Sequence, residues 1–120
     1  MVGESQFSCY MLYLNRAFQY RTYSYEFSIA PALHGDDIAY TFYNATATGS
    51  VDQEVVTAIQ DYILNFVRSG DPSQDSQVPP FPRHDVLNEV MDLNRSHIYP
   101  IADITNNPRC AWWQNVPLAT

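Results

Sequence analysis

The chain has 120 residues, of which 46% are hydrophobic and 14% aromatic, and its formal net charge is −7 at pH 7. This length and composition indicate one globular domain at most and exclude a disordered chain. All basic residues are arginines scattered along the sequence, so no basic patch points to nucleic acid or to an anionic membrane surface. No apolar run reaches the roughly 18 residues that a membrane span needs.

The first residues and the cysteines bear on the cellular compartment. The opening MVGESQFSCYMLYL has no basic group before its apolar stretch, so we expect no signal peptide in the chain as written. Cys9 and Cys110 are too few and too far apart for a zinc site, which leaves buried free thiols or one long-range disulfide. The sequons at Asn44 and Asn94 are glycosylation acceptors if the chain is secreted. Sequons and cysteines together favour a secretory compartment.

The N-terminal part combines a predicted helix with a predicted strand. Residues 7–19 are rich in apolar and aromatic side chains and contain no proline or glycine, which favours a buried or half-buried helix. Residues 21–30 alternate with period two, which is typical of a strand. The aromatic face of this strand would carry Tyr23, Tyr25 and Phe27. Pro31 ends the strand, and residues 38–44 fit either a further strand or an irregular helical turn.

The clearest predicted element is an amphipathic helix within residues 51–72. Its apolar side chains recur at helical spacing. They are Val55, Val56, Ile59, Ile63, Phe66 and Val67. Ser50 or Asp52 is in position to cap its start, and Gly70 with Pro72 ends it. Its polar face is a solvated surface to which we assign no site.

The C-terminal part contains a loop, a strand pair and a last helix. Residues 71–84 are rich in Pro, Ser, Asp and Gln and predict an exposed, extended loop. Residues 87–103 predict two short strands around a polar turn at residues 94–96. Residues 107–116 predict a short helix with Asn107 as its cap.

One histidine stands in a distinctive loop, with the sequence PALHGDD. A histidine on such a turn serves packing, metal binding or general-base catalysis. His34 with Asp36 or Asp37 offers too few metal ligands, at a spacing that no zinc pattern requires. His84 and His97 lie in other predicted elements. We therefore expect no metal and no cofactor.

Several segments in register carry a resemblance to a known family. They are Phe7–Cys9, the run YRTYSYEFSIAPALHGDDIAYTF, the helix AIQDYILNFVRSGDP, the PPFP loop and the closing RCAWWQ. Together they resemble the C-terminal portion of a type-B carboxylesterase, the cholinesterase-like family that includes fungal triacylglycerol lipases. The secreted fungal esterases are the most similar kind. The resemblance covers residues 7–114 and implies an α/β fold: the last strands of an α/β-hydrolase sheet with flanking helices, an incomplete domain over residues 1–120.

The resemblance implies that His34 is the family's catalytic histidine. A general base needs its imidazole at the carboxyl edge of a strand, with serine and substrate on one side and an orienting acid on the other. Asp36 and Asp37 are too near in sequence to reach that far side easily, so we expect them to be polar residues of the turn and of the entry to a following strand. The chain order in α/β-hydrolases is nucleophile, acid, histidine. We therefore expect the serine, the acid and the oxyanion loop upstream of this chain.

The resemblance further implies a disulfide between Cys9 and Cys110, and a secreted full-length protein that acts on a carboxylic ester. Without a nucleophile and an oxyanion hole, we expect the 120 residues alone to be inactive. The alternatives are a non-catalytic truncated remnant or interaction module, and a separate binding domain. An open sheet edge also predicts marginal stability and self-association.

Overall fold

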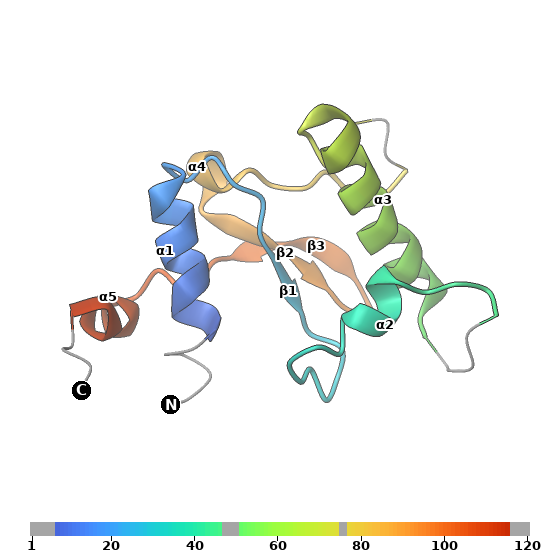
Figure 1. The fold of residues 1–120 in the computed structure, drawn as a ribbon, viewed down its shortest axis with the longest axis horizontal. Helices are drawn as coiled ribbons and strands as arrows, with labels where there is room; N and C mark the ends of the chain where they lie inside the picture. Colours follow the sequence, from blue (N-terminus) through green and yellow to red (C-terminus); the bar gives the residue numbers. More distant parts are fainter. Residues whose placement is uncertain (1–6, 47–50, 75–76, 116–120) are drawn as a thin grey trace.

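The computed structural model describes residues 7–46, 51–74 and 77–115 (Figure 1). The elements are α1 (Cys9–Ala17), β1 (Tyr25–Phe27), α2 (Ile38–Thr41), α3 (Gln53–Ser69), α4 (His84–Leu87), β2 (Glu89–Leu93), β3 (Ile98–Ala102) and α5 (Pro108–Asn115). This mixture of helices around a small sheet confirms the predicted α/β class. No helix in these ranges is long and apolar enough to cross a membrane.

The sheet has the strand order β1-β2-β3. β1 runs parallel to β2, with Tyr25 opposite Met91 and Phe27 opposite Leu93. β2 and β3 form an antiparallel hairpin around residues 94–96, as the sequence predicts. Figure 1 shows α2 and α3 on one side of the sheet and α1 with α5 on the other. Within the described ranges β1 is paired only with β2, so its second edge is open.

The strand predicted over residues 21–30 is shorter than expected, because only Tyr25–Phe27 pair as a strand. The predicted alternation of side chains between the two faces of this segment is nevertheless correct. Tyr23 packs edge-on against aromatic rings on the α3 side. Ser24 points to the opposite side and donates a hydrogen bond to the Asn15 Oδ1 of α1 at 3.2 Å. The polar face of β1 is therefore partly covered by α1.

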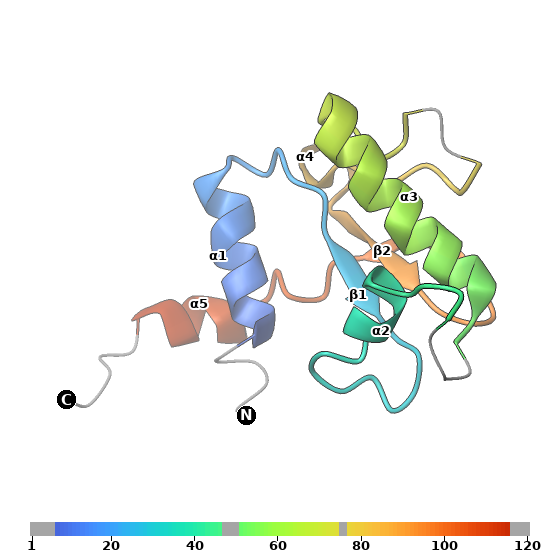
Figure 2. The same ribbon diagram turned by 45° about the vertical axis from the view of Figure 1, so that its right-hand side comes forward.

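The helix α3 confirms the predicted amphipathic helix, and local sequence explains both of its ends. The Asp52 carboxylate accepts hydrogen bonds from two backbone N–H groups of the first turn. Gly70 follows the last residue with φ at +78°, the left-handed conformation that favours glycine. Ser50, the other candidate cap, lies outside the described residues. Residues 38–44, left open by the sequence, contain the short helix α2, which packs beside α3 (Figure 2).

Only part of the apolar face of α3 is covered. Its first turns form the main core with residues of α2, β2 and β3. The buried residues of α3 are Val55, Val56, Ala58, Ile59 and Tyr62. The last turns of the same face remain open, since Ile63, Phe66 and Val67 are 42%, 50% and 77% exposed. No described element packs over these three side chains closely enough to bury them.

The loop over residues 71–84 is less exposed than the sequence predicts. Phe81 packs edge-on against Tyr62 of α3, with ring centroids 4.8 Å apart. The Tyr62 hydroxyl donates to the Pro79 carbonyl at 2.7 Å, and Pro82 is buried. Aromatic packing and this hydrogen bond hold the loop against α3, which its polar composition does not indicate.

A second, smaller core joins α1 to α5. Cys9 and Cys110 form a disulfide and are 0% and 1% exposed. This finding decides between the two alternatives for the cysteines and confirms the pairing that the resemblance implies. Leu12 is buried in the same cluster, and Tyr13 and Trp113 pack against it. The predicted last helix, α5, is also confirmed, and its cap is an asparagine side chain as expected.

Replacing both cysteines, Cys9→Ala with Cys110→Ala, should lower the free energy of unfolding by about 4 to 5 kcal/mol, because the bond closes a loop of about 100 residues. Denaturant titration of the oxidised protein and of the variant measures the difference. Wild-type protein treated with a thiol reductant is the control, and it should match the variant. Equal stability of the oxidised and reduced wild type would contradict this role.

Candidate active site

The PALHGDD segment forms a tight loop beyond the carboxyl end of β1. Gly35 has φ at +91°, in the left-handed region that glycine adopts without strain. The Leu33 N–H donates to the Asp36 carboxylate at 2.8 Å, and the Asp36 N–H donates to the Leu33 carbonyl at 3.0 Å. These two reciprocal bonds close the turn that displays His34.

Asp37 ties this loop to the strand. The Tyr25 hydroxyl of β1 donates to Asp37 Oδ2 at 2.6 Å. Burial raises the pKa of Tyr25, and the hydrogen bond to Asp37 and its negative charge raise that pKa further. The hydroxyl therefore keeps its proton and remains a donor. Asp36 lies in the turn, as the sequence predicts, whereas Asp37 precedes the helix α2 and not a strand.

His34 itself is exposed and borders an open cleft. Its ring lies against Phe7, with centroids 4.5 Å apart and planes at 33°. The cleft, which we call the His34 cleft, has a volume of about 720 Å³ and lies between α1, β1 and the loop. No side chain of the described residues hydrogen-bonds to the imidazole, so both ring nitrogens can receive partners.

The second histidine, His84, is closed to any substrate. Its Nε2 lies 2.8 Å from Asp103 Oδ2, and the two side chains are 1% and 3% exposed. The Tyr20 ring stacks on the imidazole, with centroids 5.4 Å apart. Its Nδ1 is buried with no hydrogen-bond partner among the described residues. This pair links α4 to the segment after β3.

The third histidine, His97, belongs to a closed ring of side chains at the β2–β3 turn, which we call the turn ring. Its Nε2 lies 2.7 Å from Asp92 Oδ2, and its Nδ1 lies 3.0 Å from Ser96 Oγ. Ser96 Oγ donates to Asn94 Oδ1 at 3.0 Å. Asn94 Nδ2 donates to Ser28 Oγ at 2.8 Å. The Ser28 hydroxyl donates to Asp92 and closes the ring.

The turn ring contains a serine, a histidine and an aspartate, but it is not arranged as a catalytic triad. In a triad the histidine Nε2 accepts the proton of the serine hydroxyl while Nδ1 faces the acid. Here Nε2 faces Asp92, and the Ser96 hydroxyl donates to the Asn94 amide oxygen. The ring therefore stabilises the turn and leaves no free nucleophile.

Sequence reasoning missed both histidine–aspartate pairs. The available signal for one of them was Asp92 within the apolar strand EVMDL, because a carboxylate at a buried strand position needs a partner. No local sequence signal connects His84 to Asp103, which are 19 residues apart.

In the described ranges, no group of three or more His, Cys, Asp or Glu side chains could hold a metal ion.

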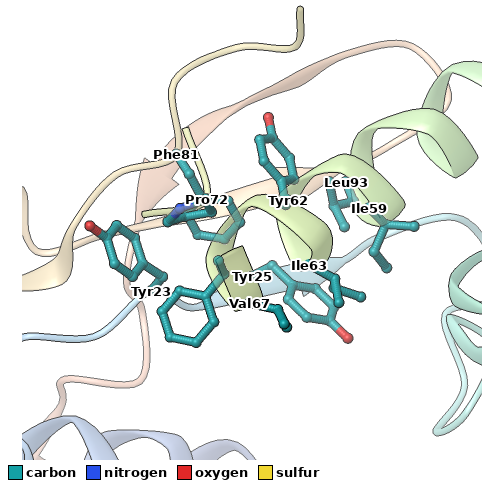
Figure 3. Close-up of a pocket in the computed structure, with 10 residues that line it drawn as sticks. Tyr23, Tyr25, Ile59, Tyr62, Ile63, Val67, Pro72, Phe81 and Leu93 are labelled. Carbon is teal, nitrogen blue, oxygen red and sulfur yellow. The ribbon is translucent and has the colours of Figure 1, made fainter. Parts of the chain in front are cut away.

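An apolar groove of about 200 Å³ lies between the β1 segment, α3 and the loop before α4 (Figure 3), and we call it the β1 groove. Figure 3 shows side chains from β1, α3 and the loop before α4 converging on it. It is lined by Tyr23, Tyr25, Ile59, Tyr62, Ile63, Phe66, Val67, Pro72, Phe81 and Leu93. Tyr25 borders both the β1 groove and the His34 cleft.

A mixed α/β chain with an exposed histidine beyond the carboxyl end of a parallel strand is consistent with part of an α/β-hydrolase. Residues 1–113 match the carboxylesterase family, and the chain belongs to that family. It is 35% identical over 112 residues to a protein named carboxylesterase patB of Aspergillus clavatus. It is 28% identical over 115 residues to carboxylesterase patB of Penicillium expansum.

These alignments cover 91% and 95% of this chain but only 20% of each relative. The chain therefore spans about a fifth of the length of the relatives that it matches. Family membership confirms the resemblance seen in the sequence.

Tyr25→Phe keeps the ring in place and removes the hydroxyl that donates to Asp37. We expect amide exchange at residues 33–37 to become about three- to tenfold faster, because one hydrogen bond of about 1 kcal/mol is lost. NMR hydrogen exchange measures the change. Tyr99→Phe, on the other edge of the sheet, is the control and should leave these amides unaffected. Unchanged exchange in Tyr25→Phe would refute the anchoring role.

The buried pair predicts a pH dependence of stability. Burial raises the pKa of Asp103, but hydrogen bonds from Thr105 and His84 outweigh burial and hold that pKa below its usual value. A carboxylate with a lowered folded pKa stabilises the protein above its unfolded pKa of about 3.9. That stabilisation is lost as the pH falls through the folded pKa.

We therefore expect wild type to be more stable than Asp103→Asn at pH 5, and the gap in free energy of unfolding to shrink as the pH falls below about 4. Denaturant titrations at a series of pH values test this. Asp61→Asn, on the surface of α3, is the control for removing a carboxylate outside the pair. A difference in free energy of unfolding that grows as the pH falls would contradict a lowered pKa of Asp103 in the folded protein.

Proposed function

We propose that this chain is the C-terminal segment of the catalytic domain of a serine carboxylester hydrolase, and that His34 is its general base. The observation that carries the proposal is the contrast among three histidines. His84 and His97 are each bonded to an aspartate, whereas His34 is exposed beside an open cleft with both ring nitrogens free of partners among the described residues. Family membership supports ester hydrolysis as the chemistry.

In this role His34 takes the proton of a serine hydroxyl as the serine attacks the ester carbonyl, and returns it to the leaving alcohol. One ring nitrogen faces the serine, and the other faces an orienting carboxylate. Asp36 and Asp37 are already engaged, with the Leu33 N–H and the Tyr25 hydroxyl respectively. The acid, the nucleophile and the oxyanion donors therefore come from polypeptide outside these residues, and the chain alone is inactive.

The open side of the sheet supports a larger domain. Parallel strands are normally covered on both faces and occur in larger sheets, yet β1 is paired with β2 alone in the described chain. Exposed Ile63, Phe66 and Val67 line the β1 groove. The relatives are about five times longer than the aligned segment. We propose that the upstream part of the domain pairs with β1 and fills the groove.

The test measures hydrolysis of p-nitrophenyl acetate and butyrate by the chain and by the full-length protein. The isolated chain should show no turnover above its own His34→Ala variant. In the full-length protein, His34→Ala should lower kcat/KM on the order of 10⁴-fold or more, because triad members act as a unit. His97→Ala, which breaks the turn ring, is the matched control and should retain kcat in its folded fraction.

Two outcomes would count against the proposal. Turnover by the isolated chain that His34→Ala abolishes would show that the missing groups are present in it. Full activity of the full-length His34→Ala variant would remove His34 from the mechanism.

An interaction module is the second candidate function, and the exposed β1 groove favours it. Here the chain is a non-catalytic product that self-associates through the open edge of β1. Sedimentation equilibrium should then show dimers that Val67→Glu disperses.

An immunoblot of source material with an antibody against α3 separates the two candidates. A band near 13.7 kDa supports the module, and a band several times heavier supports the esterase.

We also place the full-length protein in the secretory pathway. The Cys9–Cys110 disulfide is the supporting observation, because such bonds persist in oxidising compartments. The sequons at Asn44 and Asn94 are compatible with that location.

A further inference from the structure

The two sequons adopt the same local turn. Asn44 Oδ1 accepts hydrogen bonds from the Thr46 hydroxyl at 2.6 Å and from the Thr46 N–H at 3.0 Å. Asn94 Oδ1 accepts the equivalent bonds from Ser96, at 3.0 Å from the hydroxyl and 3.1 Å from the N–H. The amide oxygen is fixed in the same way at both sites, so any difference between the sites lies at Nδ2, the atom that N-glycosylation modifies.

The two Nδ2 atoms have opposite surroundings. Asn44 is exposed, and its Nδ2 has no hydrogen-bond partner among the described residues. Asn94 is half-buried, and its Nδ2 donates to Ser28 Oγ at 2.8 Å and to the Ser28 carbonyl at 3.3 Å. The Nδ2 of Asn94 is therefore engaged with Ser28, whereas that of Asn44 has no described partner.

The turn ring holds Asn94 in this position. Ser28 follows β1 and Asn94 follows β2, and the two residues are 66 positions apart in the chain. A sugar on Asn94 Nδ2 would replace one of its two protons and would occupy space where Ser28 lies. It would crowd the contact with Ser28 in the ring that also contains Asp92 and His97. A sugar on Asn44 disturbs no described contact.

We propose that Asn44 is the N-glycosylated residue of this chain and that Asn94 stays unmodified in the folded protein. The donor class is an oligosaccharide linked to a polyisoprenyl diphosphate. A bond forms between Asn44 Nδ2 and the sugar C1, and the bond from C1 to the diphosphate oxygen breaks. The diphosphate leaves with the electron pair, and Nδ2 loses one proton to a base. Asn44 keeps its Oδ1, so the bonds from Thr46 survive.

The experiment expresses the chain behind a secretion leader in a eukaryotic host and isolates the disulfide-bonded fraction. Peptide:N-glycosidase treatment in heavy-oxygen water marks each occupied asparagine, and peptide mass spectrometry locates the mark. Thr46→Ala and Ser96→Ala form the matched pair, since each removes one sequon and keeps its asparagine. We expect the mark at Asn44 in wild type and in Ser96→Ala, and no mark in Thr46→Ala.

A mark at Asn94 in the disulfide-bonded wild type would overturn the proposal. A secreted chain that carries no mark at Asn44 would overturn it as well. The mapping involves no ester hydrolysis, so its result is independent of the catalytic role proposed for His34.

Discussion

The parallel pairing of β1 with β2 is the contact on which the rest of the structure depends. It joins Tyr25–Phe27 to residues 91–93 across the whole of α2, α3 and the following loop. Packing of α3 on one face of the paired strands offsets the entropy of closing so long a segment. The pairing also positions the His34 loop, which starts beyond β1, and the turn ring, which forms where β2 ends beside Ser28.

Elements specified by neighbouring residues could be predicted from the sequence, whereas long-range partners could not. The Asp52 cap, the Gly70 end of α3 and the β2–β3 hairpin all follow from local signals. The length of β1 does not, because it depends on where β2 lies. His34 was identified through the resemblance of its surroundings to a family. The pairing of His84 with Asp103 arises only when α4 and the segment after β3 come together.

The side of the sheet facing α1 explains why two histidines serve structure. Glu26 of β1 stands directly opposite Asp92 of β2, and like charges in that position are unfavourable. Burial and the charges of Asp92 and Asp103 raise the pKa of Glu26. His97 and His84 each provide a hydrogen-bond partner for one of these two aspartates. The two imidazoles thus supply hydrogen-bond partners on a side of the sheet that is rich in carboxylates. Among the three histidines, His34 alone has no such aspartate partner in the described residues.

The disulfide gives the molecule a covalent ring that encloses every strand and the His34 loop, since its cysteines are 101 positions apart. A protease that cuts one peptide bond inside this ring adds a water molecule but releases no fragment. The nicked protein would run as an intact chain until the disulfide is reduced. Purity judged without reductant therefore says little about whether the polypeptide is whole.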